Sequence, residues 1–375
     1  MRIGILGSRG IPNTYGGFEQ FASRISVELC ARGHEVYVYN SSLHPYRKSE
    51  WQTVHIIHRK DFENRIGTIG QFIYDFNCIL DARQRDFDLL LQLGYTSNSV
   101  WHWLWPRNTV NIINMDGFEW KRTKYSWLAR KYLKKAERWA ANHGDYLVAD
   151  SPAIKKYISD NYGKMCTYVP YGADIFHDAD ASELKSFDLH PHAYYLVVCR
   201  MEPENNIELI INGYLHSSTD YPLVIVGNFE NQFGKQLRRK YTNEPIKFLG
   251  FIHDQVLLNN LRFFSRLYFH GHSVGGTNPS LLEAMACNCN IVAHDNIFNK
   301  QVLTGNASYF LTVADVTKII TAPHEENIWQ ERREKNLERI KTEYSWERIV
   351  DEYETMFFIA ISSKNQTKLA KLASQ

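Results

Sequence analysis

Buried strands and amphipathic helices alternate along the first half of the chain. The run 2–6 (RIGIL) predicts a strand, and a glycine-rich loop follows it. After the loop, apolar residues fall on one helical face that ends at Gly33, namely Phe18, Phe21, Ala22, Ile25 and Leu29. Further strands are predicted at 35–40, 53–58, 88–93, 109–114 and 145–150.

The second half repeats this pattern, with strands predicted at 194–199, 222–227, 246–251, 267–272 and 290–295. Continuous apolar strands that alternate with helices indicate parallel sheets covered on both faces. The polar segment 177–192 separates the two halves. We therefore expect two Rossmann-like domains facing a central cleft, at 1–184 and 185–345, followed by a last segment at 346–375.

Composition changes this picture little. At 375 residues the chain exceeds what one hydrophobic core usually supports. Its net charge of +2 gives no reason to expect nucleic acid as a partner. No apolar run approaches the ~18 residues that a membrane span requires, and the first run is too short for a signal peptide. The six scattered cysteines predict free thiols in a reducing cytosol, so we expect a cytoplasmic protein, soluble or peripheral on a membrane.

The glycines after the first strand do not have the spacing of a dinucleotide-binding loop, because they stand at positions 4, 7, 10, 16 and 17. The second strand also ends at Asn40, where such a loop needs an acidic residue for the ribose. Nicotinamide binding is therefore not expected. The amides of Gly16 and Gly17, at the start of the next helix, either face a phosphate or a substrate hydroxyl, or the glycines only satisfy backbone geometry.

The segment 271–292 (GHSVGGTNPSLLEAMACNCNIV) predicts an anion-binding helix start. Asn278 is a good N-cap residue, and Pro279 suits the first helical position. The small residues Gly275, Gly276 and Thr277 precede it. Free amides at a helix start attract negative charge, and a diphosphate would fit there.

Glu283 lies one turn inside that helix. A carboxylate at this depth is placed to accept hydrogen bonds from two vicinal hydroxyls, such as those of a ribose. The alternative is an ordinary solvated glutamate, which is what most helix glutamates are. The flanking residues 281–286 are otherwise apolar and leave little polar face, which favours a specific partner for this carboxylate.

Arg200 stands at the carboxyl end of the strand 194–199, the edge where open α/β sheets bind ligands. A guanidinium there can hold a diphosphate through two hydrogen bonds and stabilise it as a leaving group. The alternative is a surface ion pair with Glu202 or Glu204. The position at the strand end favours the first interpretation.

Several segments resemble family 4 glycosyltransferases of the GT-B fold: CRMEPENN (199–206), PSLLEAMACNCNIV (279–292), YGADIF (171–176) and YSWERIVDEYETMF (344–357). Three others are similar to the rhamnosyltransferase-like branch, whose N-terminal half is a domain of unknown function: GSRGIPNTYGGFEQF (7–21), NMDGFEWKR (114–122) and GHSVGGTNPSLLEAM (271–285). The resemblance implies a GT-B fold, with the donor bound by the second domain, the acceptor bound by the first, and a C-terminal helix that crosses back to the first domain.

Two departures from that family bear on the donor. Many members carry a glutamate where this chain has Gly275, and a lysine where it has Asn205. Loss of the carboxylate puts a glucose- or mannose-type sugar contact in doubt, and loss of the lysine leaves Arg200 with the amides of 276–280 to hold the phosphates. Both departures are shared with the rhamnosyltransferase-like branch, which indicates a different donor sugar.

The resemblance also implies the mechanism. It indicates a retaining transfer in which a donor phosphate oxygen takes the acceptor proton, without a metal or other cofactor, the sugar nucleotide being a substrate. Two D-x-D sequences, Asp178/Asp180 and Asp86/Asp88, are interpreted as chance matches because one lies in the polar segment and the other precedes a buried strand.

Three further residues are site candidates. Asp116 follows the strand 109–114 and either orients the acceptor hydroxyl or accepts its proton, or it only caps the turn before Gly117. Glu119 is a weaker candidate on the same segment. His272 ends a strand beside the predicted phosphate loop and either contacts the sugar or is structural.

The segment 121–139 carries eight Lys or Arg residues and one Glu, with Leu128, Tyr132, Ala136 and Trp139 at helical spacing. An apolar stripe flanked by cations is typical of a helix that lies on an anionic bilayer. The alternative is a basic helix whose stripe packs on its own sheet. Under the first interpretation, the residues expected at the acceptor or membrane are Asp116, Glu119, Lys121, Arg122, Trp127 and Lys131.

We expect a glycosyltransferase that moves L-rhamnose from dTDP-L-rhamnose to a lipid-linked glycan at the inner face of the cell membrane, in the synthesis of a bacterial surface polysaccharide. Its expected donor-binding residues are Gly16, Gly17, Arg200, Asn205, His272, Gly276, Thr277, Asn278 and Glu283, with Arg200 and Asp116 catalytic. The alternatives are another UDP- or GDP-hexose donor, a nucleotide-sugar epimerase of the same fold, or an inactive nucleotide-binding protein.

Overall fold

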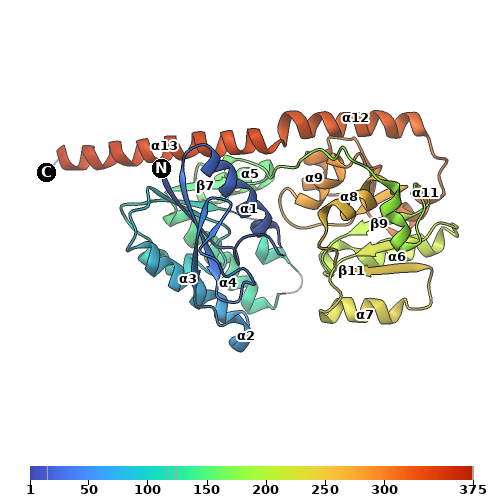
Figure 1. Ribbon diagram of the computed structural model, residues 1–375, viewed down its shortest axis with the longest axis horizontal. Helices are drawn as coiled ribbons and strands as arrows, with labels where there is room; N and C mark the ends of the chain where they lie inside the picture. Colours follow the sequence, from blue (N-terminus) through green and yellow to red (C-terminus); the bar gives the residue numbers. More distant parts are fainter. Residues whose placement is uncertain (15, 116, 123–124, 374–375) are drawn as a thin grey trace. The chain divides into compact units, whose positions relative to one another are not determined.

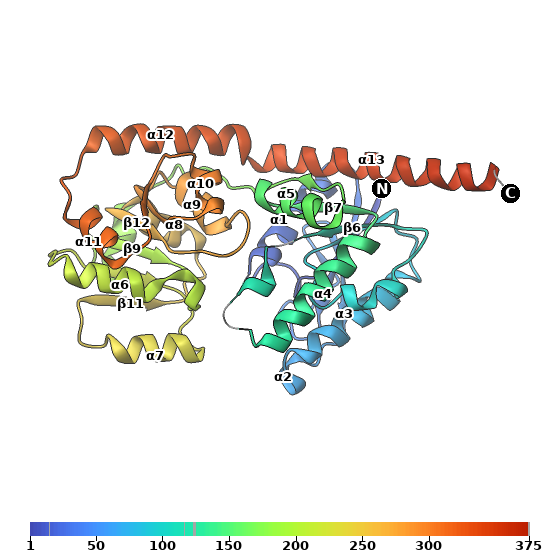
Figure 2. The same cartoon turned by 180° about the vertical axis from the view of Figure 1, so that it is seen from behind.

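The computed structural model describes residues 1–14, 16–115, 117–122 and 125–373. The chain divides into two compact units (Figure 1). The first comprises Met1–Trp120, Trp127–Pro170 and Glu347–Gln375, and the second comprises Lys121–Ser126 and Tyr171–Trp346. Each unit contains one sheet with helices packed around it, as the view from behind also shows (Figure 2).

The first sheet is parallel except at one edge, where β3 pairs antiparallel with β4. Its strands lie in the order β3-β4-β2-β1-β5-β6-β7-β8. Their bounds are β1 (Arg2–Leu6), β2 (Glu35–Ser41), β3 (Glu50–Trp51), β4 (Val54–Arg59), β5 (Leu89–Gln92), β6 (Val110–Asn114), β7 (Tyr146–Ala149) and β8 (Thr167–Tyr168). In the middle of the sheet, Ile3 lies opposite both Val36 and Leu89.

Helices pack around this sheet. They are α1 (Gly17–Ala31), α2 (Glu63–Ile66), α3 (Ile69–Ala82), η1 (Ser99–Leu104), η2 (Glu119–Lys121), α4 (Trp127–His143), α5 (Pro152–Tyr162) and α13 (Trp346–Ala373). The closing helix α13 packs against the first unit, as the resemblance implied. The rings of Phe21 and Tyr353 lie 5.2 Å apart, and His34 Nε2 lies 2.6 Å from a carboxylate oxygen of Glu354.

The second sheet is parallel throughout, in the order β11-β10-β9-β12-β13-β14. Its strands are β9 (Tyr195–Val198), β10 (Leu223–Val226), β11 (Ile246–Gly250), β12 (Leu267–His270), β13 (Ile291–His294) and β14 (Ser308–Phe310). Its helices are η3 (Ala181–Phe187), η4 (Pro203–Asn205), α6 (Ile207–His216), α7 (Gln232–Lys240), α8 (Gln255–Phe263), α9 (Pro279–Ala286), α10 (Ile297–Leu303), α11 (Val313–Thr321) and α12 (Glu326–Glu343).

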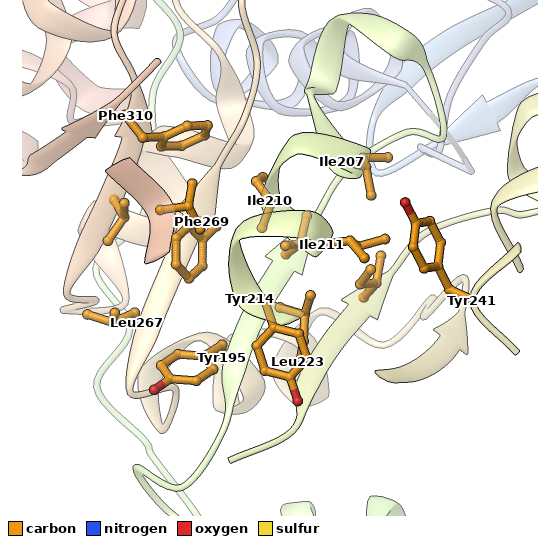
Figure 3. Packing of buried hydrophobic residues seen from close by; sticks show 14 of the residues in the cluster. Tyr195, Ile207, Ile210, Ile211, Tyr214, Leu223, Tyr241, Leu267, Phe269 and Phe310 are labelled. Atoms are coloured by element: carbon orange, nitrogen blue, oxygen red, sulfur yellow. The ribbon is translucent and has the colours of Figure 1, made fainter. Parts of the chain in front are cut away.

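Alternate residues of the second sheet face different helices, because successive side chains of a strand point to opposite faces. Tyr195 and Phe269 pack with Ile210 and Ile211 of α6 in one buried cluster (Figure 3). On the opposite face, the Tyr268 hydroxyl lies 2.8 Å from the hydroxyl of Ser280 in α9. Both faces are therefore buried, and this explains why the strands are continuous apolar runs.

The predicted fold class is confirmed, and each predicted strand is present with bounds that shift by at most two residues. Three strands were not predicted: β3, β8 and β14, which have two or three residues each. The order of the second sheet reverses between β9 and β12, because the chain first builds outward through β10 and β11 and then returns. Ligands of open α/β sheets bind at such reversals.

Asp75 is one of the buried carboxyls of the first unit. Asp75 of α3 is 4% exposed, and its Oδ2 accepts a hydrogen bond from the Ser97 hydroxyl at 2.6 Å. Burial raises the pKa of Asp75 to about 7, Ser97 lowers it, and the nearby Asp61 raises it. The folded carboxyl therefore keeps its proton between about pH 4 and pH 7, where an unfolded aspartate has lost it.

We expect the free energy of unfolding to fall as the pH rises through that window, because the folded state then binds more protons than the unfolded state. Asp75→Asn should remove this loss and raise the stability at pH 8.5 relative to wild type by about 1–3 kcal/mol. Urea unfolding at pH 5.5 and pH 8.5 measures both effects. The control is Asp160→Asn, at an exposed carboxylate of α5 paired with Lys156. Equal pH dependence in wild type and Asp75→Asn would contradict the assignment.

Candidate functional site

Two loops meet at the reversal of the second sheet, one after β9 (199–206) and one after β12 (271–278). The backbone amide and the hydroxyl of Ser273 both donate to the carbonyl oxygen of Glu204, at 3.0 and 2.9 Å. The Asn206 side chain donates to the carbonyl oxygen of Gly271 at 2.8 Å. The two loops are thus hydrogen-bonded to each other at the carboxyl edge of the sheet.

Arg200 is exposed at the end of β9. Its guanidinium makes no ion pair or hydrogen bond within the described part of the chain, so the surface pair with Glu202 or Glu204 that the sequence allowed is not observed. Its charge is one of those that lower the pKa of His272 in the second loop. An exposed guanidinium next to a helix start can receive a phosphate.

The start of α9 has the predicted cap. The Asn278 side chain accepts a hydrogen bond from the Ser280 amide at 2.9 Å, and Pro279 occupies the first turn. Gly275 has φ +130°, a region that residues with a side chain rarely adopt. Gly276 and the buried Thr277 lead from it into the helix. Arg200 follows β9, and this helix start follows β12. Because β9 and β12 are neighbours in the sheet, the two features lie at adjacent strand ends.

Glu283 has a partner that the sequence did not reveal. Its Oε2 lies 2.5 Å from a guanidinium nitrogen of Arg262, at the end of α8. The Arg262 side chain is 1% exposed and also donates to Asn259 and, at 3.4 Å, to Ser280. Burial lowers the pKa of Arg262 and Glu283 raises it, and the net direction is upward. Glu283 is therefore not a solvated surface glutamate.

His272 is half-buried, and its side chain contacts the first loop. Its Nδ1 lies 2.9 Å from Oδ1 of Asn205, and the Asn205 amide group donates to the Arg200 carbonyl oxygen at 2.7 Å. Asn205 is 6% exposed. The Asn205 side chain therefore joins Arg200 to His272.

In the first unit, the glycine-rich loop after β1 is held by side chains. Asn40 accepts from the Ile11 amide at 3.0 Å and donates to its carbonyl oxygen at 2.7 Å. Gly16 precedes α1 with φ 132°, and a Cβ there would collide with the carboxylate of Glu19. Gly16 thus has a backbone reason to be glycine, while Gly17 begins α1.

The acceptor candidates are distributed over both units. Asp116 lies outside the described residues. Glu119 is buried in η2. Lys121 is exposed and Arg122 is 9% exposed, and both group with the second unit. Arg122 is among the cations that lower the pKa of His272, so its charge acts at the second-unit loops.

Most of the apolar stripe of α4 faces inward. The Tyr132 hydroxyl donates to the Thr96 carbonyl oxygen at 2.7 Å, and Ala136 is fully buried. The Trp139 ring lies 6.1 Å from the His102 ring of η1. The sequence left open whether the stripe meets a membrane or its own unit, and these contacts show packing on its own unit.

The outward face of α4 is cationic and aromatic. Trp127 and Leu128 are 65% and 69% exposed, and the Lys131 ammonium lies 3.7 Å from the centre of the Trp127 ring. Lys135 and Arg138 are exposed on the same face.

Glu137, the acidic residue of α4, is 2% exposed. It accepts hydrogen bonds from Trp120, Lys134, Tyr157 and Tyr162. The acidic charge of this helix is therefore directed inward, and the outward face keeps its positive charge.

The two D-x-D sequences have local roles. Asp180 caps η3 by accepting from the Ser182 amide, and Asp88 accepts from the Arg2 amide at 2.7 Å. Among the residues that the structure describes, no group of three or more His, Cys, Asp or Glu side chains is arranged to hold a metal ion. In the same residues, no helix is long and apolar enough to cross a bilayer.

Two family models match parts of the chain. Residues 184–328 match "Glycosyl transferases group 1", and residues 107–174 match a domain of unknown function, DUF1972. No functionally curated protein matches the chain.

Solved structures resemble the whole chain. Sucrose-phosphate synthase from Thermosynechococcus elongatus aligns with a TM-score of 0.79 at 14% identity, over 96% of this chain and 99% of the other. HepE from Anabaena, in complex with UDP-glucose, aligns with a TM-score of 0.71 at 15% identity, over 100% of both chains. α,α-Trehalose 6-phosphate synthase from Burkholderia multivorans aligns with a TM-score of 0.69 at 12% identity, over 98% of this chain and 99% of the other.

These matches agree with the architecture. Two parallel-sheet units and these neighbours show the GT-B fold expected from the sequence. The group 1 match over the second unit supports a glycosyltransferase. At this level of identity the solved structures do not identify the donor sugar, and the rhamnosyltransferase-like branch is not identified by any of the matches.

The Arg262–Glu283 pair makes a stability prediction. Glu283→Gln should lower the free energy of unfolding by about 3–5 kcal/mol, because it leaves a buried guanidinium without its counter-charge. The double variant Glu283→Gln/Arg262→Met should recover much of that loss, since no buried charge then remains. Urea unfolding measures all three proteins.

The matched control is Glu331→Gln, which removes an exposed helix carboxylate paired with Lys335 and should cost at most about 0.5 kcal/mol. Glu283→Gln with wild-type stability would mean that the ion pair does not support this region.

Proposed function

We propose that this protein is a glycosyltransferase whose second unit binds the diphosphate of a sugar nucleotide. The observation that carries the proposal is Arg200 at the end of β9, which is exposed and makes no ion pair with any residue that the structure describes, next to a loop that leads into the capped start of α9. Both features lie at the reversal of the strand order, and the group 1 glycosyltransferase match covers this region.

In the proposed mechanism the protein stabilises the leaving diphosphate. Arg200 and the backbone amides of Gly276, Thr277 and Asn278 are proposed to donate to the diphosphate, and a fixed donor aimed at developing charge contributes about 3–4 kcal/mol. The transfer retains anomeric configuration, and a donor phosphate oxygen takes the acceptor proton. Asp116 is proposed to orient the acceptor hydroxyl, with Glu119 beside it in sequence.

Glu283 is proposed to bind the ribose hydroxyls of the donor nucleotide. Arg262 supports this role because its guanidinium nitrogen lies 2.5 Å from Oε2 of Glu283 and holds the carboxylate in one orientation. Gly276, Thr277 and Asn278 are proposed to bind the phosphates through this loop. Gly16 and Gly17, at the start of α1, are also proposed to be donor-binding residues.

The proposed donor is dTDP-L-rhamnose. Gly275 removes the carboxylate that many relatives place near the sugar, and a 6-deoxyhexose needs one polar partner fewer. A polar group left unpaired in such a pocket costs about 1–3 kcal/mol, enough to discriminate between donors. UDP-glucose is the second candidate, because the similar protein HepE was solved with it bound.

The proposed acceptor is a lipid-linked glycan at the inner face of the cell membrane, in the synthesis of a surface polysaccharide. The outward face of α4 supports it, with Trp127, Leu128, Lys131, Lys135 and Arg138. Exposed cations beside tryptophan favour an anionic lipid surface. Lys121 precedes this helix and would add to its charge.

A donor panel tests the function. Purified protein is incubated with a lipid-diphosphate sugar and each of dTDP-L-rhamnose, UDP-glucose, UDP-N-acetylglucosamine and GDP-mannose, and product is measured by mass spectrometry. We expect transfer from dTDP-L-rhamnose, and a loss of about a hundredfold or more in kcat for Arg200→Ala at wild-type stability. Donor turnover without an acceptor would indicate an epimerase, and no turnover of any donor would contradict the proposal.

Vesicle sedimentation tests the membrane face. Lys131→Glu/Lys135→Glu should weaken binding to phosphatidylglycerol vesicles at least about tenfold, because each cation near an anionic surface contributes about 1 kcal/mol. The matched control is Lys155→Glu/Lys156→Glu, two exposed positions of α5 with the same charge change. Equal losses in both double variants would contradict a specific role for α4.

A further inference from the structure

His272 is held from several directions. Its carbonyl oxygen accepts hydrogen bonds from the side chains of Asn296 and Asn299, both at 3.0 Å, at the start of α10. The neighbouring Ser273 bonds to the first loop through the Glu204 carbonyl oxygen. The imidazole therefore projects from a backbone that is fixed on both sides.

The hydrogen bonds determine which ring nitrogen of His272 carries the proton. A backbone carbonyl oxygen only accepts, so the Asn205 group that lies 2.7 Å from the Arg200 oxygen must be its NH₂. The Asn205 oxygen then faces His272 Nδ1 at 2.9 Å, and that nitrogen must donate. In the neutral ring this leaves Nε2 with a lone pair.

The surroundings keep this ring neutral. Burial lowers the pKa of His272 well below its usual value, and His270, Arg122 and Arg200 lower it further, while the Val274 carbonyl raises it. A second positive charge beside Arg200 is thereby avoided. The loop thus contains a cation and, next to it, a neutral hydrogen-bond acceptor.

Nε2 of His272 lies next to Gly275, a residue of the same loop that has no side chain. A Cβ placed on Gly275 would lie 3.1 Å from Nε2, tighter than an ordinary contact, and φ +130° also disfavours any residue but glycine. Gly275 and His272 therefore fit together, since the imidazole lies against the position where a side chain at 275 would begin.

We propose that His272 determines donor specificity, with its Nε2 accepting a hydrogen bond from one hydroxyl of the donor sugar, and that Asn205 is the positioning residue that holds this tautomer. The inference rests on the proposed function and deepens it. Arg200 and the amides of the loop before α9 are donors and suit phosphate oxygens, whereas the proton of a sugar hydroxyl needs an acceptor. A neutral imidazole supplies that acceptor without a negative charge next to the diphosphate. A sugar without the matching hydroxyl leaves this acceptor unpaired and binds less well.

The test compares ligands with and without the sugar. His272→Phe keeps a ring but removes the acceptor, and it should weaken binding of dTDP-L-rhamnose or UDP-glucose, whichever wild type binds, by about five- to a hundredfold. Binding of the matching nucleoside diphosphate, dTDP or UDP, should be unchanged, and this also shows that the variant is folded. Calorimetry measures each affinity.

Asn205→Leu should cause a smaller loss of the same kind, and in the His272→Phe background it should add little, because its effect acts through the imidazole. Two results would overturn the role of His272 and leave the glycosyltransferase proposal standing. One is an unchanged affinity of His272→Phe for the sugar nucleotide, and the other is an equal loss of affinity for the nucleoside diphosphate. A wild-type protein that binds no sugar nucleotide would overturn both.

Discussion

The hydrogen bonds between the loops after β9 and β12 are the constraint on which the candidate site depends. Ser273 and Asn206 join the two loops at a point where parallel strands end side by side. The chain separates these loops by more than sixty residues, yet their geometry is fixed because β9 and β12 pair directly. Arg200, the start of α9 and His272 take their positions from this junction. Fixed groups of this kind can stabilise charge without reorganising during reaction.

Much of the fold was predictable, since its signals are local. The apolar runs defined the longer strands, and the Asn278–Pro279 cap was evident because a capping side chain and a first-turn proline are adjacent in sequence. The short strands β3, β8 and β14 were missed because two or three residues carry no periodicity. The place of Arg200 at the end of a strand was predicted from the apolar run before it, which is also a local signal.

Pairings between distant elements were not predictable. Glu283 was interpreted as a ligand contact or a solvated residue, and the buried Arg262 that pairs with it comes from another helix. In the sequence, Asn40 indicated only that the acidic residue of a dinucleotide-binding loop is missing. In the structure it holds the glycine-rich loop through Ile11. The stripe of α4 had the periodicity of a membrane helix, and that periodicity is the same for a helix packed on its own unit. Each of these outcomes depends on which surfaces the fold brings together.

The most direct test of this account is hydrogen–deuterium exchange with and without a sugar nucleotide. If the junction of the two loops binds the diphosphate, dTDP-L-rhamnose or UDP-glucose should slow exchange in peptides that cover 199–206 and 271–280, because bound phosphates engage the amides there. Peptides of the buried strand β10 serve as an unchanging reference. Unchanged exchange in both loops while the ligand is bound would contradict the account.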